Sequence, residues 1–283
     1  MKNFQPVIKW TGSKRSQTEE IIKHFPNKID TYYEPCCGGA SILRGLLDKV
    51  EAGLITVNKF IISDLNQDLI NLWQIIKDNP DDLYNSYKEL WTEMNQIDDI
   101  LYKQNYYNNI RDRFNKSHDP KDFFFLLRTC YNGMVRYNAK NEFNTSFHLN
   151  RNGIHPTKIK KIIEEWSFLL KKYNVQFQTS DYKNIIPENK NDFLYMDPPY
   201  NKTNGLYYGK LNNNELFNYL SELKCNYILS YDGMSGQENH TFSVPKNLYN
   251  QHIYISSGNS SFKRLKNTNK HSNVFESLYI KNN

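Results

Sequence analysis

The sequence predicts an α/β protein with a mainly parallel sheet, a terminal antiparallel hairpin and an inserted, mostly helical domain. Three observations carry this prediction. Short apolar runs alternate with helical patterns near the start of the chain, as in parallel strands joined by helices. A long middle segment is rich in aromatic, basic and amide residues. The last two strand-like runs alternate polar and apolar residues, as antiparallel strands do.

Composition limits the class of protein. The 283 residues, 39% of them hydrophobic, suffice for one large domain or one domain with an insertion. The four cysteines lack Cys-x-x-Cys or metal-like spacing with the histidines, so we expect neither disulfides nor a metal. The chain has no apolar run of bilayer length and no signal peptide, so we expect a cytoplasmic protein without a membrane partner.

The first strand-like run, Thr31 to Glu34, leads into a glycine-rich turn. Residues 35–41 read Pro-Cys-Cys-Gly-Gly-Ala-Ser, and a helical pattern follows from Ile42 to Val50. Glycine lets a backbone approach a ligand closely, and a helix N-terminus offers unpaired N–H groups. This segment therefore predicts a ligand site at the end of the first strand.

The second strand-like run, Lys59 to Ser63, ends in Asp64, about 25 residues after the glycines, where an acidic residue can bind a ribose diol. This unit suits an adenosine-bearing cofactor, although it lacks the G-x-G-x-x-G fingerprint and no phosphate loop is present. The alternative interpretation makes Asp64 the N-cap of a helix from Gln67 to Lys77.

The N-terminal segment gathers an aromatic ring, a glycine turn and three cations ahead of a helical stretch from Gln17 to His24. Trp10 and Lys14 belong to this group, which can receive a carboxylate or a phosphate. The alternative is a solvated, charged segment whose Trp10 packs on the core.

Asp197-Pro198-Pro199-Tyr200 follows a strand-like run from Asp192 to Met196. Open α/β sheets bind ligands at the carboxyl ends of their strands, and the two prolines make this turn stiff. The Asp197 carboxylate and the Pro198 carbonyl can accept both hydrogens of an exocyclic amine, while Tyr200 stacks on the ring that carries it. A nucleobase fits this description. The alternative is a proline-rich turn that Asp197 caps.

The middle segment contains helical patterns over residues 81–94, 97–114 and 122–127, followed by a stretch rich in side chains that contact DNA. Arginine binds guanine, asparagine binds adenine, and aromatic rings wedge between base steps. The candidates for reading and distorting DNA are Tyr131, Asn132, Arg136, Tyr137 and Asn138, with Lys140 and Arg151 placed to hold phosphates. The alternative is a polar loop with core tyrosines.

The remaining strands follow the insertion. Val175 to Thr179 leads to Asp181, which can accept a hydrogen bond from an adenine amino group or cap the next turn. Further strands are expected at residues 227–231, 252–256 and 274–280. The basic loop between the last two carries Lys263 and Arg264 and suits backbone phosphates.

Taken in order, these motifs resemble those of the Dam-type, alpha-group adenine-N6 DNA methyltransferases over nearly the whole chain. The matching segments are Lys9 to Lys14, Glu34 to Ser41, Asp64 and Asp197 to Tyr200, and Tyr131 to Asn138 resembles the family's target-recognition hairpin. The sequence departs from the pattern at Cys36, where the family often has Phe, and at Ala40, where a glycine is usual.

The resemblance implies a Rossmann-like class I methyltransferase domain over residues 1–69 and 172–283, with a DNA target-recognition domain over 70–171. It implies S-adenosylmethionine as cofactor and S-adenosylhomocysteine as product. The implied cofactor-binding residues are Trp10, Lys14, Glu34, Pro35, Gly38, Asp64, Asp181 and Asp197.

The implied reaction methylates N6 of an adenine flipped out of a short sequence in double-stranded DNA, without a metal. The resemblance also implies a bacterial or phage-encoded protein, either a type II modification enzyme with a cognate restriction endonuclease or a solitary methylase. One alternative is N4 methylation of cytosine, although such enzymes more often carry Ser in place of Asp197. The other is a non-catalytic DNA-binding protein on the same scaffold.

Overall fold

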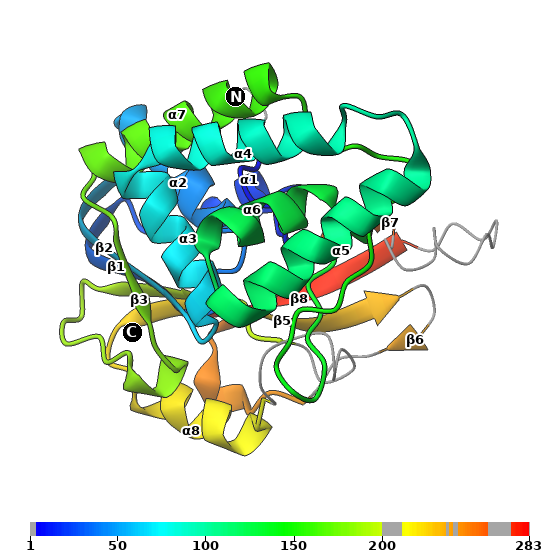
Figure 1. Cartoon of the computed structure of the whole chain (residues 1–283). Helices are drawn as coiled ribbons and strands as arrows, with labels where there is room; N and C mark the ends of the chain where they lie inside the picture. The colour runs from blue at the N-terminus through cyan, green and yellow to red at the C-terminus, as the bar shows by residue number, and fades with distance from the viewer. Residues whose placement is uncertain (1–3, 200–210, 236–237, 240–242, 260–272, 283) are drawn as a thin grey trace. The chain divides into compact units, whose positions relative to one another are not determined.

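The computed structural model describes residues 4–199, 211–235, 238–239, 243–259 and 273–282 (Figure 1). The chain divides into two units, which we describe separately. The described residues of the sheet unit are 14–63, 180–199 and those from 211 onward. Those of the helical unit are 4–13 and 64–179. The N-terminal residues thus group with the middle segment, which the predicted boundaries at residues 69 and 172 did not anticipate.

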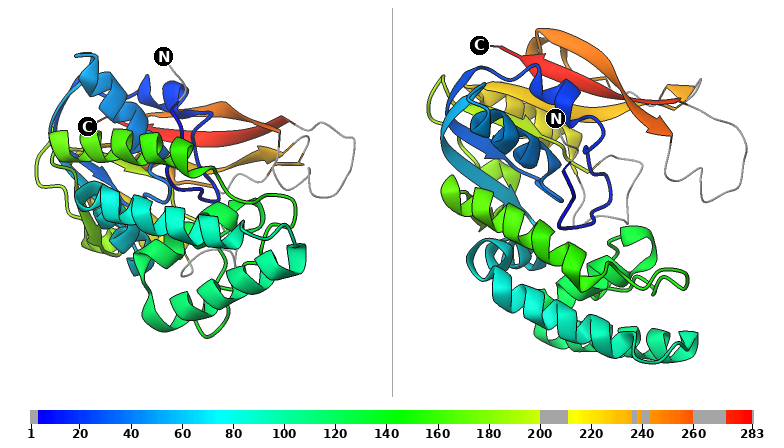
Figure 2. Two further views of the ribbon diagram at one scale, coloured as in Figure 1. Left: turned by 45° about the horizontal axis from the view of Figure 1, so that its top comes forward. Right: turned by 90° about the horizontal axis from the view of Figure 1, so that it is seen from above.

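The sheet unit is built on a mostly parallel sheet with an antiparallel end (Figures 1 and 2). The strand order in this unit is β2-β1-β4-β5-β8-β7, with β6 paired to β5. β1 pairs in parallel with β2 and β4, and β4 pairs in parallel with β5, whereas β8 is antiparallel to both β5 and β7. The predicted fold class is confirmed. The strands are β1 (Lys28–Glu34), β2 (Thr56–Asp64), β4 (Phe193–Met196), β5 (Asn226–Ser235), β6 (Glu238–Asn239), β7 (Gln251–Asn259) and β8 (Asn273–Lys281).

The central strands are buried on both faces, as expected of parallel strands. On one face, Leu194 and Met196 pack against Leu216 and Leu220 of α8 (Asn213–Glu222). On the other face the ring of Phe25 lies 4.5 Å from that of Phe193, with further rings around it. Two short 3₁₀ helices, η2 (Tyr182–Asn184) and η4 (Lys246–Leu248), complete the described connections.

Helices α1 (Thr18–Ile22) and α2 (Ser41–Glu51) approach each other closely at Gly45. A Cβ added there would lie 2.1 Å from Cγ2 of Thr18 and 2.8 Å from Cδ1 of Ile22. Glycine is ordinarily a poor residue for a helix interior. Its presence here is explained by the contact between the two helices.

The helical unit contains α3 (Gln67–Asp78), α4 (Pro80–Met94), α5 (Ile100–Ser117), α6 (Pro120–Thr129), η1 (Tyr131–Gly133), α7 (Pro156–Lys172) and the short strand β3 (Gln176–Thr179). Local signals set the helix starts. Asp99 and Asp119 cap α5 and α6 through their side chains, and proline occupies the first position of α4, α6 and α7. The predicted helix over residues 97–114 therefore begins later, at Ile100. α7 was absent from the sequence-based prediction.

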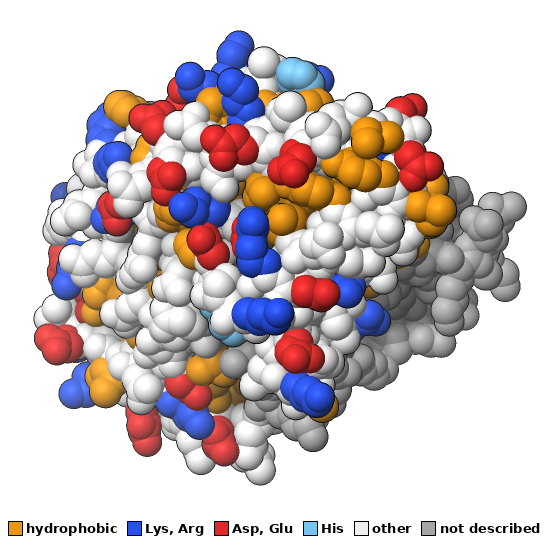
Figure 3. All heavy atoms as spheres, viewed as in Figure 1, with side chains coloured by type: hydrophobic (Ala, Val, Ile, Leu, Met, Phe, Trp, Pro, Cys, Tyr) orange, Lys and Arg blue, Asp and Glu red, His pale blue; other side chains and the backbone are white. Residues whose placement is uncertain are grey.

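The N-terminal residues pack on the helices of this unit. Trp166 Nε1 of α7 donates to the Gln5 carbonyl at 2.9 Å, and the Arg128 guanidinium of α6 donates to the Pro6 carbonyl at 3.2 Å. Figure 3 shows acidic and basic side chains interspersed over the helices that face the viewer, so the net charge of +6 does not gather there. In the described part of the chain, no helix is long and apolar enough to cross a membrane.

The contact at Gly45 generates a test of the fold. We expect Gly45→Ala to lower the free energy of unfolding by about 1–3 kcal/mol, because the added methyl overpacks the α1–α2 contact despite alanine's higher helix propensity. Urea denaturation followed by circular dichroism measures this change. Asn109→Ala, at an exposed position of α5, is the control and should not destabilise the protein. A Gly45→Ala protein as stable as wild type would contradict the packing argument.

Candidate active site and nucleic-acid interface

Two strand ends bring acidic residues to one edge of the sheet. β1 ends at Glu34 and β4 ends at Met196, directly before Asp197. The two strands are parallel neighbours, with Tyr33 in register with Leu194, so their carboxyl ends lie at the same edge. The topology thus brings together Glu34 and Asp197, as the sequence predicted for two residues 163 positions apart.

Lys14 forms the central ion pair of this edge. Its Nζ donates to both carboxylate oxygens of Asp197 at 2.7 Å, and Oε2 of Glu276 lies 3.4 Å from the same nitrogen. The Lys14 side chain is only 5% exposed, and those of Asp197 and Glu276 are 20% and 17% exposed. One buried ammonium therefore faces two carboxylates. Glu276 was missed by sequence reasoning, although an acidic residue in the middle of a strand that is otherwise mostly apolar was a usable signal.

Glu34 is buried and differs chemically from Asp197. Burial raises the pKa of Glu34 to about 8, while hydrogen bonds from the Tyr32 hydroxyl and the Leu43 backbone N–H work against that rise and the negative charge of Asp197 adds to it. The Tyr32 hydroxyl donates to Oε2 of Glu34 at 2.7 Å. Because Leu43 lies in the first turn of α2, Glu34 itself takes up part of the helix N-terminus. Near neutral pH the Glu34 carboxyl is mostly protonated.

The glycine-rich turn is tightly wound. Cys36, Gly38 and Ala40 all have positive φ, at 61°, 47° and 48°. The two departures from the family pattern therefore sit where a side chain is disfavoured. The Cys37 N–H donates to the Ser63 carbonyl at 3.0 Å, which ties the turn to the end of β2. Pro35 and Gly38 are both buried within this turn.

Asp181 and Asp64 occupy different local roles. Asp181 caps η2, its Oδ1 accepting from the Lys183 N–H at 3.0 Å, as the alternative interpretation anticipated. Asp64 does not cap the following helix. The N-cap of α3 is Asn66, whose side-chain oxygen accepts from the Leu69 N–H at 3.0 Å. Asp64 instead accepts from the Asn66 N–H at 3.0 Å.

The predicted target-recognition hairpin lies in the helical unit. Backbone bridges join Cys130 to Phe147 and Tyr137 to Phe143. The Arg136 guanidinium donates from Nε to Asn144 Oδ1 at 2.8 Å, and Asn138 Nδ2 donates to Glu142 Oε2 at 2.7 Å. The hairpin's own contacts therefore hold both predicted reading side chains. Tyr131, Asn132, Arg136 and Lys140 are exposed.

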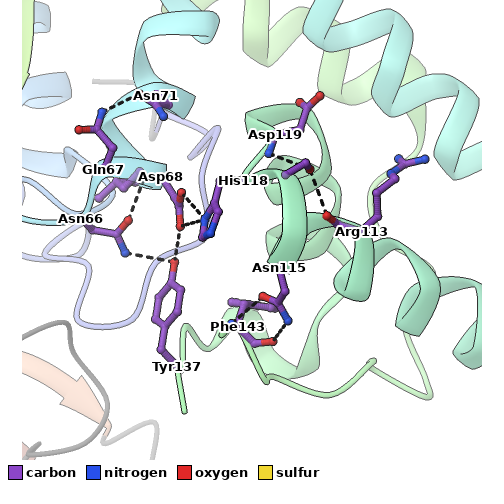
Figure 4. A network of polar contacts seen from close by, with 12 residues as sticks. Asn66, Gln67, Asp68, Asn71, Arg113, Asn115, His118, Asp119, Tyr137 and Phe143 are labelled. Carbon is purple, nitrogen blue, oxygen red and sulfur yellow. Dashed lines mark hydrogen bonds and ion pairs between the residues drawn. The ribbon is translucent and has the colours of Figure 1, made fainter. Parts of the chain in front are cut away.

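Tyr131 and Tyr137 lie in different surroundings. The Tyr131 ring stacks on His148 at a centroid distance of 5.4 Å. The Tyr137 hydroxyl accepts from Asn66 Nδ2 at 3.2 Å and donates to Asp68 at 3.4 Å (Figure 4). Trp10, in the N-terminal segment, packs edge-to-face against Phe123 of α6, so its ring joins the packing of the helical unit.

A cluster of cations lies beside the hairpin. Burial lowers the pKa of Lys9, and the charges of Arg128 and Arg151 lower it further. Burial also lowers the pKa of Arg128 to about 10, and Nε of this guanidinium has no hydrogen-bond partner in the structure. Within the described residues, none of these three cations forms an ion pair. Lys9 and Arg128 were not among the predicted DNA contacts. Arg128 directly follows the apolar run 123–127, and a charged residue at that place in a helix was a usable signal.

Gly133 explains how Lys9 reaches this cluster. Its φ is +65°, and an added Cβ would lie 2.8 Å from Cβ of Lys9. Only glycine combines that backbone conformation with that close contact.

Tyr200, Lys263 and Arg264 lie outside the described residues. Among those that are described, no three His, Cys, Asp or Glu side chains gather as a metal site requires.

The fold and the acidic sheet edge define an α/β enzyme whose helical unit carries exposed polar and cationic side chains. Residues 10–273 match the family described as D12 class N6 adenine-specific DNA methyltransferase. The chain belongs to this family.

Individual relatives agree with this assignment. The chain is 34% identical over 219 residues to the type II methyltransferase M.MjaIII of Methanocaldococcus jannaschii, covering 71% of this chain and 70% of the relative. It is 32% identical over 201 residues to the DNA adenine methylase of Haemophilus influenzae, covering 69% and 64%. The DNA adenine methylase of Escherichia coli K12 is 29% identical over 205 residues, covering 71% and 66%. The match thus spans about two thirds of each relative's length.

The predicted family, an adenine-N6 DNA methyltransferase, is confirmed by these comparisons. They favour adenine over the alternative of cytosine N4, and an enzyme over a non-catalytic DNA-binding protein. The roles of individual site residues stay predictions, as do the restriction-modification context and the domain boundaries.

The raised pKa of Glu34 gives a prediction for stability against pH. The protonated carboxyl is favoured in the folded state, so the stability that Glu34 contributes is fully present below its unfolded pKa and is lost as pH rises from there toward about 8. Glu34→Gln mimics the protonated form and removes this slope. We therefore expect its melting temperature to rise relative to wild type between pH 5 and pH 9. A difference that is the same at both pH values, or that matches the exposed control Glu222→Gln, would contradict this assignment.

Proposed function

We propose that this chain transfers the methyl group of S-adenosylmethionine to N6 of adenine within a short sequence of double-stranded DNA. The single observation that carries the proposal is the position of Asp197. This carboxylate follows β4 at the carboxyl edge of the sheet and is held by a buried lysine. Membership of the N6 adenine-specific family supplies the base.

The residues of the sheet edge fit this cofactor by charge. S-adenosylmethionine carries an activated methyl group on a cationic sulfonium, so it supplies the methyl without a metal or a covalent enzyme intermediate. Among the described residues, Lys14 faces the two carboxylates of Asp197 and Glu276. Acidic side chains at this edge suit a cationic ligand.

The proposed cofactor-binding residues come from several places in the sequence, and each has its own proposed role. Lys14 would lie against the cofactor while it stays paired with Asp197, and Glu34, Pro35 and Gly38 would line the position of the cofactor's methionine portion. Asp64, at the end of β2, would accept hydrogen bonds from the ribose hydroxyls. Trp10 and Asp181 complete the proposed set, Asp181 as acceptor for the adenine amino group.

Asp197 and the Pro198 carbonyl would orient the target amine. The N6 lone pair of adenine is delocalised into the ring, and acceptors for its two hydrogens draw the pair back toward nitrogen as it attacks. The bond from N6 to the methyl carbon forms as the carbon–sulfur bond breaks and neutral S-adenosylhomocysteine leaves, and the cationic N6 then gives a proton to water. A carboxylate offers about four lone-pair positions, so Asp197 can accept from the amine while it remains paired with Lys14.

Tyr200 would stack on the flipped adenine and offset part of the cost of removing it from the duplex. This proposal rests on the sequence alone, because Tyr200 lies outside the described residues. Lys263 and Arg264, also outside them, would contact backbone phosphates.

The hairpin and its neighbouring cations form the proposed DNA interface. Tyr131, Asn132, Arg136 and Asn138 would read or distort the duplex, with Lys140 on a phosphate. Lys9, Arg128 and Arg151 form no ion pair in the described residues, and a phosphate would neutralise the positive charge of this cluster, in which Arg128 is buried and Arg151 is exposed. Tyr137 belongs to the same hairpin with its hydroxyl already bonded within the protein.

Two cellular roles are proposed for this chain. The relatives include both a type II methyltransferase and DNA adenine methylases. This chain would accordingly serve in the cytoplasm either as the modification enzyme of a restriction-modification system, protecting the sites of a cognate endonuclease, or as a solitary methylase.

Replacing the catalytic carboxylate tests the function directly. We expect Asp197→Ala to lower single-turnover methylation by about 100-fold or more, because it removes an acceptor that acts in the transition state. The measurement uses labelled S-adenosylmethionine and unmethylated phage DNA, followed by nucleoside analysis, which identifies the product base. Asp181→Ala, at the capping aspartate of η2, is the comparison variant and should retain more activity. Near-wild-type turnover by a folded Asp197→Ala protein would overturn the assignment.

The cation cluster gives a prediction for salt dependence. We expect Arg151→Ala to reduce the slope of log Kd against log salt by about 1, because one phosphate contact is lost. Fluorescence anisotropy of a labelled duplex at several salt concentrations provides the slope. Lys121→Ala is the matched control, since this half-buried lysine already has Asp82 as a partner at 3.5 Å. Equal slopes for wild type and Arg151→Ala would remove Arg151 from the DNA interface.

A further inference from the structure

A polar network in the helical unit connects the start of α3 to the target-recognition hairpin (Figure 4). Its members are Asn66, Asp68, His118 and Tyr137. They come from three separate places in the sequence. Asn66 and Asp68 lie at the start of α3, His118 is the C-cap of α5, and Tyr137 belongs to the hairpin. The activity as described so far gives this network no role.

Asn66 is the junction of the network. Its N–H donates to Asp64 Oδ1 at 3.0 Å, and its side-chain oxygen accepts from the Leu69 N–H at 3.0 Å. Its side-chain nitrogen donates to the Tyr137 hydroxyl at 3.2 Å. Asn66 is buried, and its partners Asp64 and Tyr137 are half-buried. Two consecutive hydrogen bonds therefore lead from Asp64 to the hairpin.

Tyr137 is fixed at both ends of its side chain. Its hydroxyl accepts from Asn66 and donates to Asp68 at 3.4 Å, so both its donor and acceptor capacities are used. Its ring packs edge-to-face on Phe143, with which it also forms a backbone bridge. Arg136 and Asn138 flank Tyr137 in the chain, so the position of Tyr137 sets the position of two proposed reading residues.

Asp68 and His118 support the arrangement from the other side. His118 Nδ1 lies 3.0 Å from Asp68 Oδ1, and His118 itself ends α5 in a left-handed conformation, with φ of 52°. A second anchor of the hairpin uses none of these four side chains. Asn115 of α5 accepts from the Phe143 N–H at 2.8 Å and donates to the Phe143 carbonyl at 3.1 Å.

We propose that Asn66 and Tyr137 are positioning residues that couple cofactor binding at Asp64 to the placement of the DNA-reading hairpin. This inference rests on the proposed role of Asp64 in holding the ribose hydroxyls. A ribose bonded to Asp64 restricts that carboxylate, the carboxylate restricts Asn66, and Asn66 restricts Tyr137. Bound cofactor then raises the affinity for the cognate duplex, and by linkage the duplex raises the affinity for cofactor.

The test measures this coupling. The probe is a short duplex that contains the sequence found by mapping methylated adenines, and the cofactor probe is S-adenosylhomocysteine, which cannot react. The coupling factor is the ratio of duplex Kd without and with this probe. We expect a wild-type ratio of about 5 or more. Tyr137→Phe, which keeps the ring, and Asn66→Ser, which keeps an N-cap oxygen, should both bring the ratio close to one.

The same variants should bind S-adenosylhomocysteine alone with a Kd within about twofold of wild type. The double variant should show no further loss of coupling, because both changes break the same link. Two controls separate coupling from general damage. Tyr106→Phe removes a tyrosine hydroxyl that donates to Glu93 at 2.9 Å elsewhere in the unit. Asn115→Ala loosens the hairpin through its other anchor, so it should weaken duplex binding with and without cofactor alike.

The outcomes are distinguishable. A wild-type coupling ratio in Tyr137→Phe overturns the inference, as does an equal loss of duplex affinity with and without cofactor, which would make Tyr137 a direct DNA contact. A ratio of one in wild type that binds both probes also overturns it and leaves the proposed function standing. A wild-type protein that binds neither S-adenosylhomocysteine nor DNA contradicts the proposed function itself.

Discussion

A buried ammonium held between two carboxylates is the constraint on which the site of the sheet unit depends. Lys14 is almost fully buried, and an unpaired charge there would be strongly destabilising. Its partners come from the end of β4 and from β8, two strands with β5 between them. The ion pair therefore fixes the start of the unit against the strand edge, and it fixes Asp197 in one orientation before any ligand is present.

Glu34, the third acidic residue at this edge, is accommodated without an ion pair in the described residues. Glu34 is fully buried without a cation, and burial keeps it protonated near neutral pH. Tyr32 and the first turn of α2 supply its hydrogen bonds. The protonated Glu34 carboxyl therefore adds no negative charge to those of Asp197 and Glu276. A third ionised carboxylate would be costly so close to Asp197.

The helical unit holds the polar side chains of the proposed target-recognition hairpin in place. Reading side chains must be exposed, and exposed side chains lose entropy when they are fixed. The hairpin reduces that loss through its own contacts, with Arg136 bonded to Asn144 and Asn138 to Glu142. Asn66, Asp68 and Asn115 anchor it from the helices behind. The hairpin is thus held in part by residues outside the proposed set of DNA-reading side chains.

The sequence by itself determined the fold class, the strand ends that carry Glu34 and Asp197, and the family. These follow from local patterns, because strand periodicity, glycine turns and a proline-stiffened motif are readable over a few residues. Glu276, Lys9, Arg128 and Asn66 emerged only from the tertiary structure. Each acts through a partner distant in sequence, such as Lys14 for Glu276 or Tyr137 for Asn66. The pKa of Glu34 was likewise decided by burial, which no local pattern reports.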